Sequence, residues 1–119
     1  MGLPFVIATV ATPADVKKRK EVEFIVDSGA VYSIVPRSIL TELGIVPHSK
    51  RTFILANGEK VERELGTAAF EYQGRRGDSL VIFGESEDTS LLGATTLEGF
   101  ALILDPFSRE LKPLPMILG

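Results

Sequence analysis

One acidic residue, Asp27, occupies a position that favours chemistry. The apolar run Phe24–Val26 leads directly into it, and Ser28 and Gly29 follow. A carboxylate at the end of such a run is expected at the mouth of a buried strand, where the loss of water is costly unless neighbouring groups compensate. The Ser28 hydroxyl can donate or accept a hydrogen bond, and Gly29 allows a tight turn and the close approach of another group. We therefore expect Asp27 to be held in place by its surroundings, and a carboxylate is a side chain that can do acid–base chemistry.

The same tripeptide has a simpler interpretation, because Asp, Ser and Gly favour turns and could merely end a strand. A second segment, Leu91–Phe100, favours the functional interpretation, since two leucines and a glycine precede a short helix-like stretch there. Together the two segments resemble the retroviral-type aspartic proteases (retropepsins) and their single-domain bacterial and archaeal relatives. The resemblance follows the order of elements over most of the chain and is sharpest at Val26–Ala30 and Leu91–Gly93.

An aspartic protease needs two carboxylates, but the chain contains a single Asp-Ser-Gly. The other aspartates lack both the apolar lead and the Ser-Gly that follows; they are Asp15, Asp78, Asp88 and Asp105. The resemblance therefore implies an obligate homodimer in which Asp27 meets its mate across a two-fold axis and cleaves a peptide or protein substrate. Such a pair retains one proton, as aspartic protease dyads do. One carboxylate would act as general base on a water while the other protonates the peptide carbonyl.

The resemblance also implies roles for neighbouring residues. Ser28 would form a hydrogen bond across the axis, although its hydroxyl could instead cap its own turn. Gly29 would let the substrate backbone approach, and Ala30 would line the pocket. Asn57 and Gly58 fall where the family has the tip of a flap that closes over the substrate and excludes water. An ordinary surface hairpin would use the same Asn-Gly pair.

Two positions depart from the viral pattern. Viral members commonly carry a charged residue two places after the Gly of the aspartate motif and an Arg directly after the late Gly, and these residues pair. The chain has Val31 and Ala94 at these positions. Because both charged partners are missing together, no charge is stranded, and an apolar contact is expected instead.

Length and composition narrow the class of protein. At 119 residues, with 45% hydrophobic and 24% charged residues, the chain is expected to form one domain over residues 1–119. The net charge of −3 argues against nucleic-acid binding, and the one basic cluster, Lys17–Lys20, is expected to be a solvated turn. No cysteine and a single histidine, His48, argue against a thiol or zinc site, so no metal or cofactor is expected. No apolar run reaches membrane-spanning length and no signal peptide is recognised, so we expect no membrane partner and a cytoplasmic location.

The hydrophobic pattern predicts an all-β domain with little helix, and the resemblance implies a closed-barrel-like, homodimeric retropepsin (acid protease) fold with one short helix in the C-terminal half. Asn57-Gly58 predicts a two-residue type I′ turn, with Arg75 and Arg76 at the exposed tip of another hairpin. The tail Leu111–Gly119, which contains prolines, is expected to be an edge strand or an interface arm. Strands are predicted at Phe5–Thr12, Glu21–Val26, Val31–Val35, Arg51–Ala56, Lys60–Leu65, Thr67–Tyr72, Leu80–Phe83 and Phe100–Leu104, with short helical stretches at Arg37–Leu43 and Ala94–Glu98.

Two other functions stay open at this point. A dimeric β-barrel of the same fold could bind extended peptides by strand addition without hydrolysing them. This alternative does not explain why the chain has an intact Asp-Ser-Gly, because a protein that only binds peptides has no need for a carboxylate at a buried axis. A serine hydrolase built from Ser28, His48 and an aspartate is the weaker alternative, because nothing around Ser28 resembles a nucleophile elbow.

Overall fold

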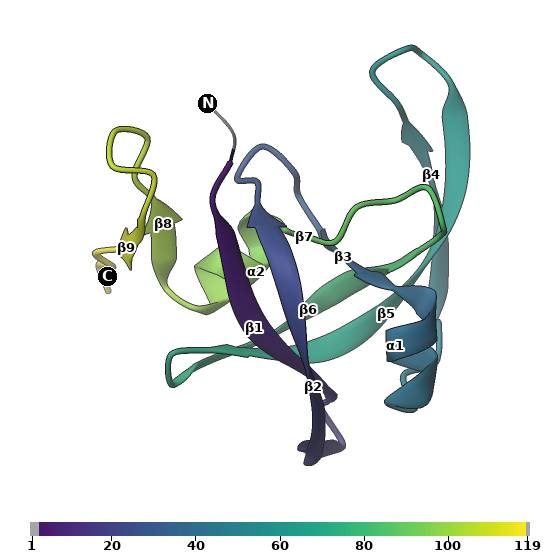
Figure 1. Cartoon of the computed structure of the whole chain (residues 1–119), viewed down its shortest axis with the longest axis horizontal. Coiled ribbons are helices and arrows are strands. Elements are labelled where there is room, and N and C mark those ends of the chain that lie inside the picture. The colour runs from purple at the N-terminus through teal and green to yellow at the C-terminus, as the bar shows by residue number, and fades with distance from the viewer. Residues whose placement is uncertain (1–2, 119) are drawn as a thin grey trace.

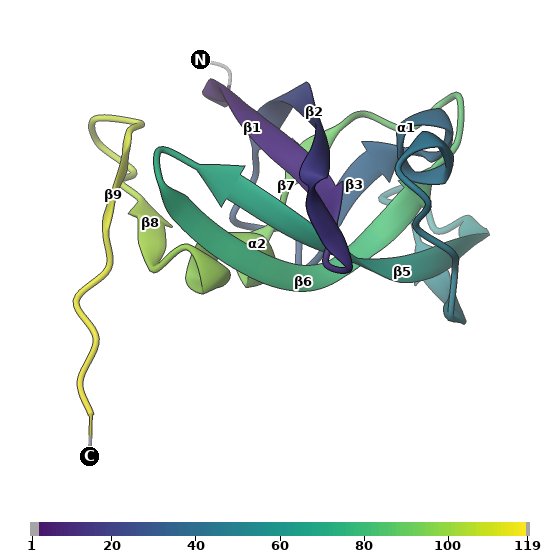
Figure 2. The same cartoon turned by 90° about the horizontal axis from the view of Figure 1, so that it is seen from below.

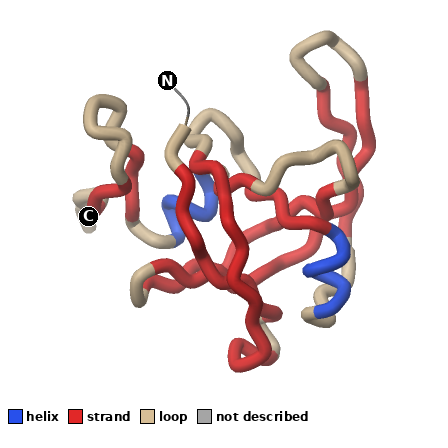
Figure 3. Tube along the Cα trace, in the orientation of Figure 1, coloured by secondary structure: helices blue, strands red, loops and turns tan. Residues whose placement is uncertain are grey.

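The computed structural model describes residues 3–118, and within them the chain forms nine strands and two short helices (Figure 1). The strands are β1 (Phe5–Thr12), β2 (Asp15–Val26), β3 (Ser33–Pro36), β4 (Ser49–Ile54), β5 (Lys60–Tyr72), β6 (Arg75–Gly84), β7 (Leu91–Leu92), β8 (Leu102–Leu104) and β9 (Leu111–Pro113). The helices are α1 (Arg37–Glu42) and α2 (Ala94–Gly99). Figure 3 shows how strands dominate the trace, so the prediction of a mostly β fold is confirmed.

Seven of the strands form one curved sheet in the order β1-β2-β7-β3-β6-β5-β4. The sheet bends back on itself, because β1 also pairs with β5 over three residue pairs. It is nevertheless not a clear closed barrel. The short strand β7 pairs with β2 through two residue pairs and with β3 through one, so the sheet has few hydrogen-bonded pairs where β7 lies. The prediction of a closed barrel is therefore met only in part: the architecture is mostly β and strongly curved, but the barrel is not clearly closed.

The core lies inside this curved sheet and is built from the alternating residues of its strands. Phe24 of β2 and Phe70 of β5 are fully buried and pack edge to face, with ring centroids 6.2 Å apart. Phe83 and Leu92 are also buried and bring β6 and β7 into the same cluster. Gly66 lets the layers approach, since a Cβ there would lie 2.9 Å from the Phe83 ring. Period-two burial thus sets which face of β2 points inward near its end, whereas β5 is buried on both faces at Ala68–Phe70.

The basic cluster Lys17–Lys20 was predicted to be a turn, and this prediction is wrong. These residues continue β2, where Lys20 pairs with Val10 and Arg19 with Ala11. Their side chains stay largely exposed, so the strand is formed by backbone pairing with β1 and needs no apolar face at this end. The chain reverses earlier, where Thr12 pairs with Asp15 after a register shift.

Two segments that were predicted as separate strands form a single strand. The segments Lys60–Leu65 and Thr67–Tyr72 form one strand, β5, that runs through Gly66 without a break. A two-residue turn of type I′ joins β5 to β6 at Gln73-Gly74, where φ is 48° and 78°. Arg75 does not sit at an exposed tip. It opens β6 and donates a 2.8 Å hydrogen bond to the Phe100 carbonyl, next to the end of α2.

Two short helices are present where one was implied for the fold. Helix α1 lies within the predicted range Arg37–Leu43 and ends at Glu42, and Gly44 beyond the C-cap has a φ of 81°. Helix α2 matches the predicted stretch Ala94–Glu98 and is one residue longer. Each helix has six residues, and no helix in the described part of the chain is long and apolar enough to cross a membrane.

The C-terminal segment forms a separate two-stranded sheet. Strand β9 pairs antiparallel with β8, and Pro113 lies opposite Leu102. The tail prediction is thus confirmed for an edge strand at Leu111–Pro113, while Gly119 lies outside the described residues. Figure 2 shows the chain beyond β9 running away from the rest of the molecule, where Leu118 is fully exposed.

The turn between β8 and β9 is held by one charged residue, Asp105. Its carboxylate accepts backbone hydrogen bonds from Phe107 and Ser108 at 2.8 and 3.1 Å, and Lys112 lies 3.0 Å away. The Lys112 ammonium, followed by the two N–H groups, lowers the pKa of Asp105 to about 2 from its ordinary 3.8. The ionised carboxylate therefore stabilises the folded turn above about pH 4, and this contribution disappears as the pH falls through about 2.

We expect Asp105→Asn to lower stability at neutral pH, because the amide keeps the oxygen acceptor but loses the attraction to Lys112. Urea unfolding of the two proteins should differ near pH 6 and converge as the pH approaches about 2. Lys112→Gln should show the same convergence. A difference that stays constant across this range would mean that the Asp105 charge does not stabilise the turn.

Candidate active site

Asp27 lies at the end of β2, where the strand leaves the core. Val26 immediately before it is fully buried, and the Asp27 side chain is half-buried. The Asp27 N–H donates a 2.9 Å hydrogen bond to the Leu92 carbonyl, which continues the parallel β2–β7 pairing by one residue. Strand β7 therefore fixes the position of Asp27, and the two sequence segments that carried the resemblance are neighbours in space.

The carboxylate is oriented by its own loop, here called the Asp27 loop (residues 27–32). Oδ1 accepts a 3.0 Å hydrogen bond from the Gly29 N–H, while Oδ2 accepts none from the described residues. A Cβ on Gly29 would lie 3.2 Å from Oδ1, so glycine leaves room beside the carboxylate. The Ser28 side chain is exposed, and its hydroxyl has no hydrogen-bond partner among residues 3–118. It does not cap its own turn.

The far side of the Asp27 loop is fastened to the start of α2. The Ala94 N–H donates to the Ala30 carbonyl at 2.7 Å, and the Thr95 N–H donates to the Val31 carbonyl at 3.0 Å. The Thr95 hydroxyl adds a 2.6 Å bond to the same carbonyl. The Val31 side chain is 61% exposed, so the two segments are joined chiefly through backbone groups. Ala30 is half-buried, and its backbone ties the loop down.

A buried chain of hydroxyl groups lies beneath the loop. The Gly93 N–H donates to Ser33 Oγ at 3.0 Å, and Ser33 Oγ lies 2.5 Å from Thr96 Oγ1. Thr96 in turn bonds Ser79 of β6 at 3.0 Å. Ser33 and Thr96 are fully buried, and no buried side-chain oxygen or nitrogen in the described residues lacks a partner. This network links β3, β6 and α2 directly behind the Asp27 loop.

Gly93 is the tightest point of this arrangement. A Cβ there would lie 2.6 Å from the Tyr32 carbonyl oxygen and 2.9 Å from that of Ala30. Both are backbone atoms, and the Ala30 carbonyl is already held by the hydrogen bond from the Ala94 N–H, so they cannot move away cheaply. The glycine in Leu-Leu-Gly is therefore required for the Asp27 loop to lie against α2.

The β4–β5 ribbon rises on the same side of the molecule as the loop that follows β2 (Figure 1). Its tip contains Asn57 and Gly58, both exposed, but the predicted type I′ turn is wrong. Of these two residues only Gly58 has a positive φ, 87°. The Gly58 N–H donates to the Leu55 carbonyl, and the Leu55 N–H donates to the Glu59 carbonyl. This is a longer loop closed by a left-handed glycine, and the Asn57 side chain accepts the Glu59 N–H at 2.9 Å. Neither tip residue bonds the Asp27 loop.

The ribbon meets the Asp27 loop below its tip, at Tyr32. The Arg51 guanidinium donates a hydrogen bond to the Tyr32 hydroxyl and lies 5.4 Å from the centre of its ring. Phe53 packs edge to face on the same ring, with centroids 6.4 Å apart. Arg51 and Phe53 alternate along β4 and thus share one face of the ribbon. That face is turned toward the Asp27 loop.

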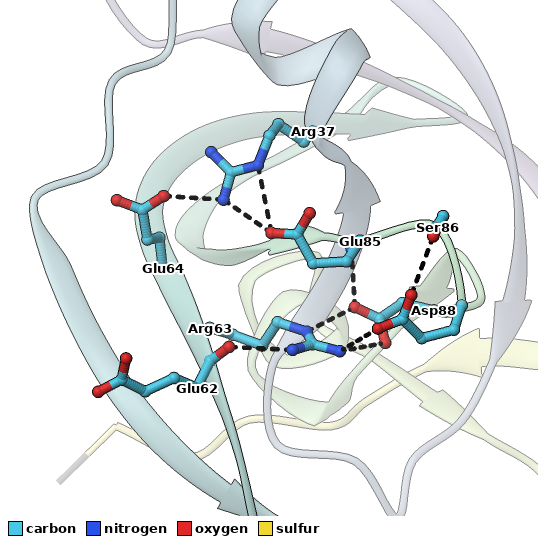
Figure 4. A network of polar contacts seen from close by, with 8 residues as sticks. Arg37, Glu62, Arg63, Glu64, Glu85, Ser86 and Asp88 are labelled. Carbon is cyan, nitrogen blue, oxygen red and sulfur yellow. Dashed lines mark hydrogen bonds and ion pairs between the residues drawn. The ribbon is translucent and has the colours of Figure 1, made fainter.

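Charged side chains anchor the base of the ribbon (Figure 4). Arg63 of β5 forms a two-pronged pair with Asp88 at 2.7 and 3.0 Å, and this pair lowers the pKa of Asp88 against the opposing effect of burial. Arg37 bridges Glu85 and Glu64, which raises the pKa of its guanidinium. These pairs hold the ribbon to the segment before β7 and to the start of α1.

The structure does not assemble the serine hydrolase alternative. Both ring nitrogens of His48 bond other hydroxyls, Ser49 at 2.8 Å and Thr67 at 2.9 Å, and Ser28 is not among them. In the described part of the chain no cluster of histidine, cysteine or acidic residues could hold a metal ion.

The curved sheet, with an aspartate loop fastened to the helix that follows β7, belongs to the fold class of the retroviral proteases. The solution structure of the simian foamy virus (mac) protease is similar with a TM-score of 0.57 and 20% identity, covering 80% of this chain and 92% of that one. The structure of the foamy viral protease-reverse transcriptase dRH in complex with double-stranded DNA has a TM-score of 0.55 and 16% identity, covering 97% of this chain but 17% of that longer one. These likenesses show the fold.

Sequence comparison adds the family. Residues 12–96 match the family described as aspartyl protease. The chain belongs to this family, and the predicted retropepsin-like relationship is confirmed. A search of curated proteins finds no significant match.

Sequence reasoning missed several residues that position the site. Ser33 and Thr96 were not singled out, although Ser33 alternates with buried Val35 and so falls on the core face of β3. Tyr32 and Arg51 were also missed. Their contact joins residues 19 positions apart and has no local signal in the chain.

We expect Thr96→Val to destabilise the protein by about 1–3 kcal/mol, because the buried Ser33 and Ser79 hydroxyls would lose a shared partner. Thr95→Val is the matched control, since its hydroxyl serves a carbonyl that also accepts the Thr95 N–H. Denaturant unfolding of both variants measures the difference. Equal losses for the two would show that the buried hydroxyl chain is not an essential support.

Proposed function

We propose that this protein is an aspartic endopeptidase that cleaves peptide bonds as a homodimer, with one Asp27 from each subunit. The observation that carries the proposal is the state of the Asp27 carboxylate. Its Oδ1 is oriented by the Gly29 N–H, while Oδ2 and the neighbouring Ser28 hydroxyl have no partners in the described chain. The segment lies within the part that matches the aspartyl protease family. A held carboxylate with an open oxygen suits a site completed by a second chain.

The chemistry follows from bringing two such carboxylates together. Like charges at close range disfavour double ionisation, so the pair holds one proton. The ionised Asp27 takes a proton from a water placed between the two groups, and that water attacks the peptide carbonyl carbon. The protonated Asp27 gives its proton to the carbonyl oxygen as the centre becomes tetrahedral. Collapse of this intermediate breaks the C–N bond, with a proton passing to the leaving nitrogen, and no covalent enzyme intermediate is formed.

The surrounding residues fit this arrangement. The exposed Ser28 hydroxyl is free to bond the partner subunit across the two-fold axis, and Gly29 leaves space beside the carboxylate for a substrate backbone. Ala30 would line the pocket at the fixed edge of the loop. The ribbon tip at Asn57 and Gly58 would act as a flap, hinged above the Tyr32 and Arg63 contacts that hold its base. We propose no cofactor, because the dyad and water supply the whole reaction.

We expect Asp27→Asn to reduce cleavage of an unfolded protein substrate at mildly acidic pH by at least about 10²-fold, since the amide can neither take nor give the proton. Sedimentation should show that the dimer persists. Asp15→Asn is the matched control, because that exposed aspartate serves only the nearby Lys17 N–H.

A variant that cleaves as fast as the parent would refute the assignment. If neither form cleaves at any pH, but both bind extended peptides saturably, the domain is a peptide-binding module of the same fold.

A further inference from the structure

We propose that Arg51 selects substrates by binding an acidic side chain at the place where the β4–β5 ribbon meets the Asp27 loop. The inference rests on the proposed peptidase function and assigns it a substrate class. It also makes Arg51 a specificity residue, with no part in the proton transfers. Three observations carry it: where Arg51 lies, how its charge is partnered, and which residue stands opposite it.

Arg51 lies on the face of the ribbon that is turned toward the Asp27 loop. Its guanidinium contacts the Tyr32 ring and hydroxyl, and Tyr32 ends the loop that begins with the proposed catalytic aspartate. Phe53 shares this face two residues closer to the tip and touches the same ring. An extended substrate lying between loop and ribbon would therefore pass the exposed side of Arg51.

The charge of Arg51 is held by neutral groups. Three other arginines bond carboxylates: Arg63 bonds Asp88, Arg37 bonds Glu85, and Arg76 bonds Asp78. Within residues 3–118, Arg51 has no carboxylate at ion-pair distance, and its partner is the Tyr32 hydroxyl and ring. A guanidinium has five N–H donors, so most of them stay available to a ligand.

The position of Arg51 is unfavourable for the ribbon itself. It pairs directly with Arg63 across the β4–β5 ladder, and like charges in such a pair are destabilising. Asp88 and Glu87 offset the charge of Arg63, but nothing in the described chain offsets that of Arg51. A bound anion would offset the charge of Arg51 in the same way.

The geometry favours a carboxylate as that anion. A planar guanidinium binds a carboxylate through two parallel hydrogen bonds, and stacking on Tyr32 limits the rotamers that must be ordered on binding. In the proposed dimer the two-fold axis places one Arg51 on each side of the paired Asp27 residues. Acidic side chains on either side of the cleaved bond are therefore the expected preference.

The test begins by mapping the bonds that the parent cleaves in a denatured protein by mass spectrometry. Two peptides are then made from one mapped site, differing only by Glu or Gln at the acidic position near the bond. We expect the parent to favour the Glu peptide about tenfold in kcat/KM, the effect of one charge-assisted hydrogen bond, mostly through KM. Arg51→Met should remove the preference, and Arg51→Glu should reverse it. Arg76→Met, a charge loss away from this face, should keep it.

The ratio between the two peptides separates charge recognition from a purely structural role. If Arg51 only braced the ribbon, its loss would slow both peptides equally and leave the ratio unchanged. Equal cleavage of the Glu and Gln peptides by the parent would overturn the inference while leaving the proposed peptidase intact. If the parent cleaves nothing, the peptidase proposal fails. In that case, binding is measured with two labelled extended peptides that differ only by Glu or Gln. If the parent and Arg51→Glu bind the Glu peptide with equal affinity, the role of Arg51 is overturned as well.

Discussion

The backbone attachment of the Asp27 loop to the segment around Gly93 is the constraint on which the rest of the site depends. Asp27 bonds the last residue of β7, Ala30 bonds the first residue of α2, and Gly93 lies between these two attachments. Main-chain hydrogen bonds of this kind fix position without regard to side chains. The carboxylate can therefore point outward while its loop stays in place. No side chain fits at Gly93, because backbone fills the space where a Cβ would be.

The same attachment explains why buried hydroxyl groups, and not an apolar cluster, lie behind the loop. Polar backbone groups at the start of α2 need partners once they are removed from water. The Ser33 hydroxyl accepts a hydrogen bond from the Gly93 N–H and is itself bonded to the Thr96 hydroxyl, which bonds that of Ser79. A network of this kind is directional, so it sets the distance between β3 and α2 more narrowly than apolar contacts would. Its precision matters because the carboxylate needs a defined direction.

The sequence predicts the elements that depend on local patterns and misses those that depend on distant partners. Strand β1 and helix α2 were found from alternation and composition, and Asp27–Ala30 from an apolar run ending in Asp-Ser-Gly. Lys17–Lys20 was predicted as a turn because a run of charged residues can be read directly from the sequence. The backbone pairing with β1, which makes the segment a strand, depends on a distant partner and cannot be read in this way. Asn57-Gly58 indicated the right hairpin and the wrong turn, since the chemistry of Asn-Gly permits more than one loop length.

The single chain holds only half of the chemistry proposed for it, and this has a kinetic consequence. An isolated half-buried carboxylate with one open oxygen is in contact with water and has no second acid to protonate a peptide carbonyl. In the proposed dimer, the meeting of two Asp27 residues creates both the general base and the general acid. Activity would then follow the concentration of dimer and fall more steeply than the total protein on dilution. The ribbon, fixed at its base by Tyr32 and Arg63, would close over a groove that exists only when two chains meet.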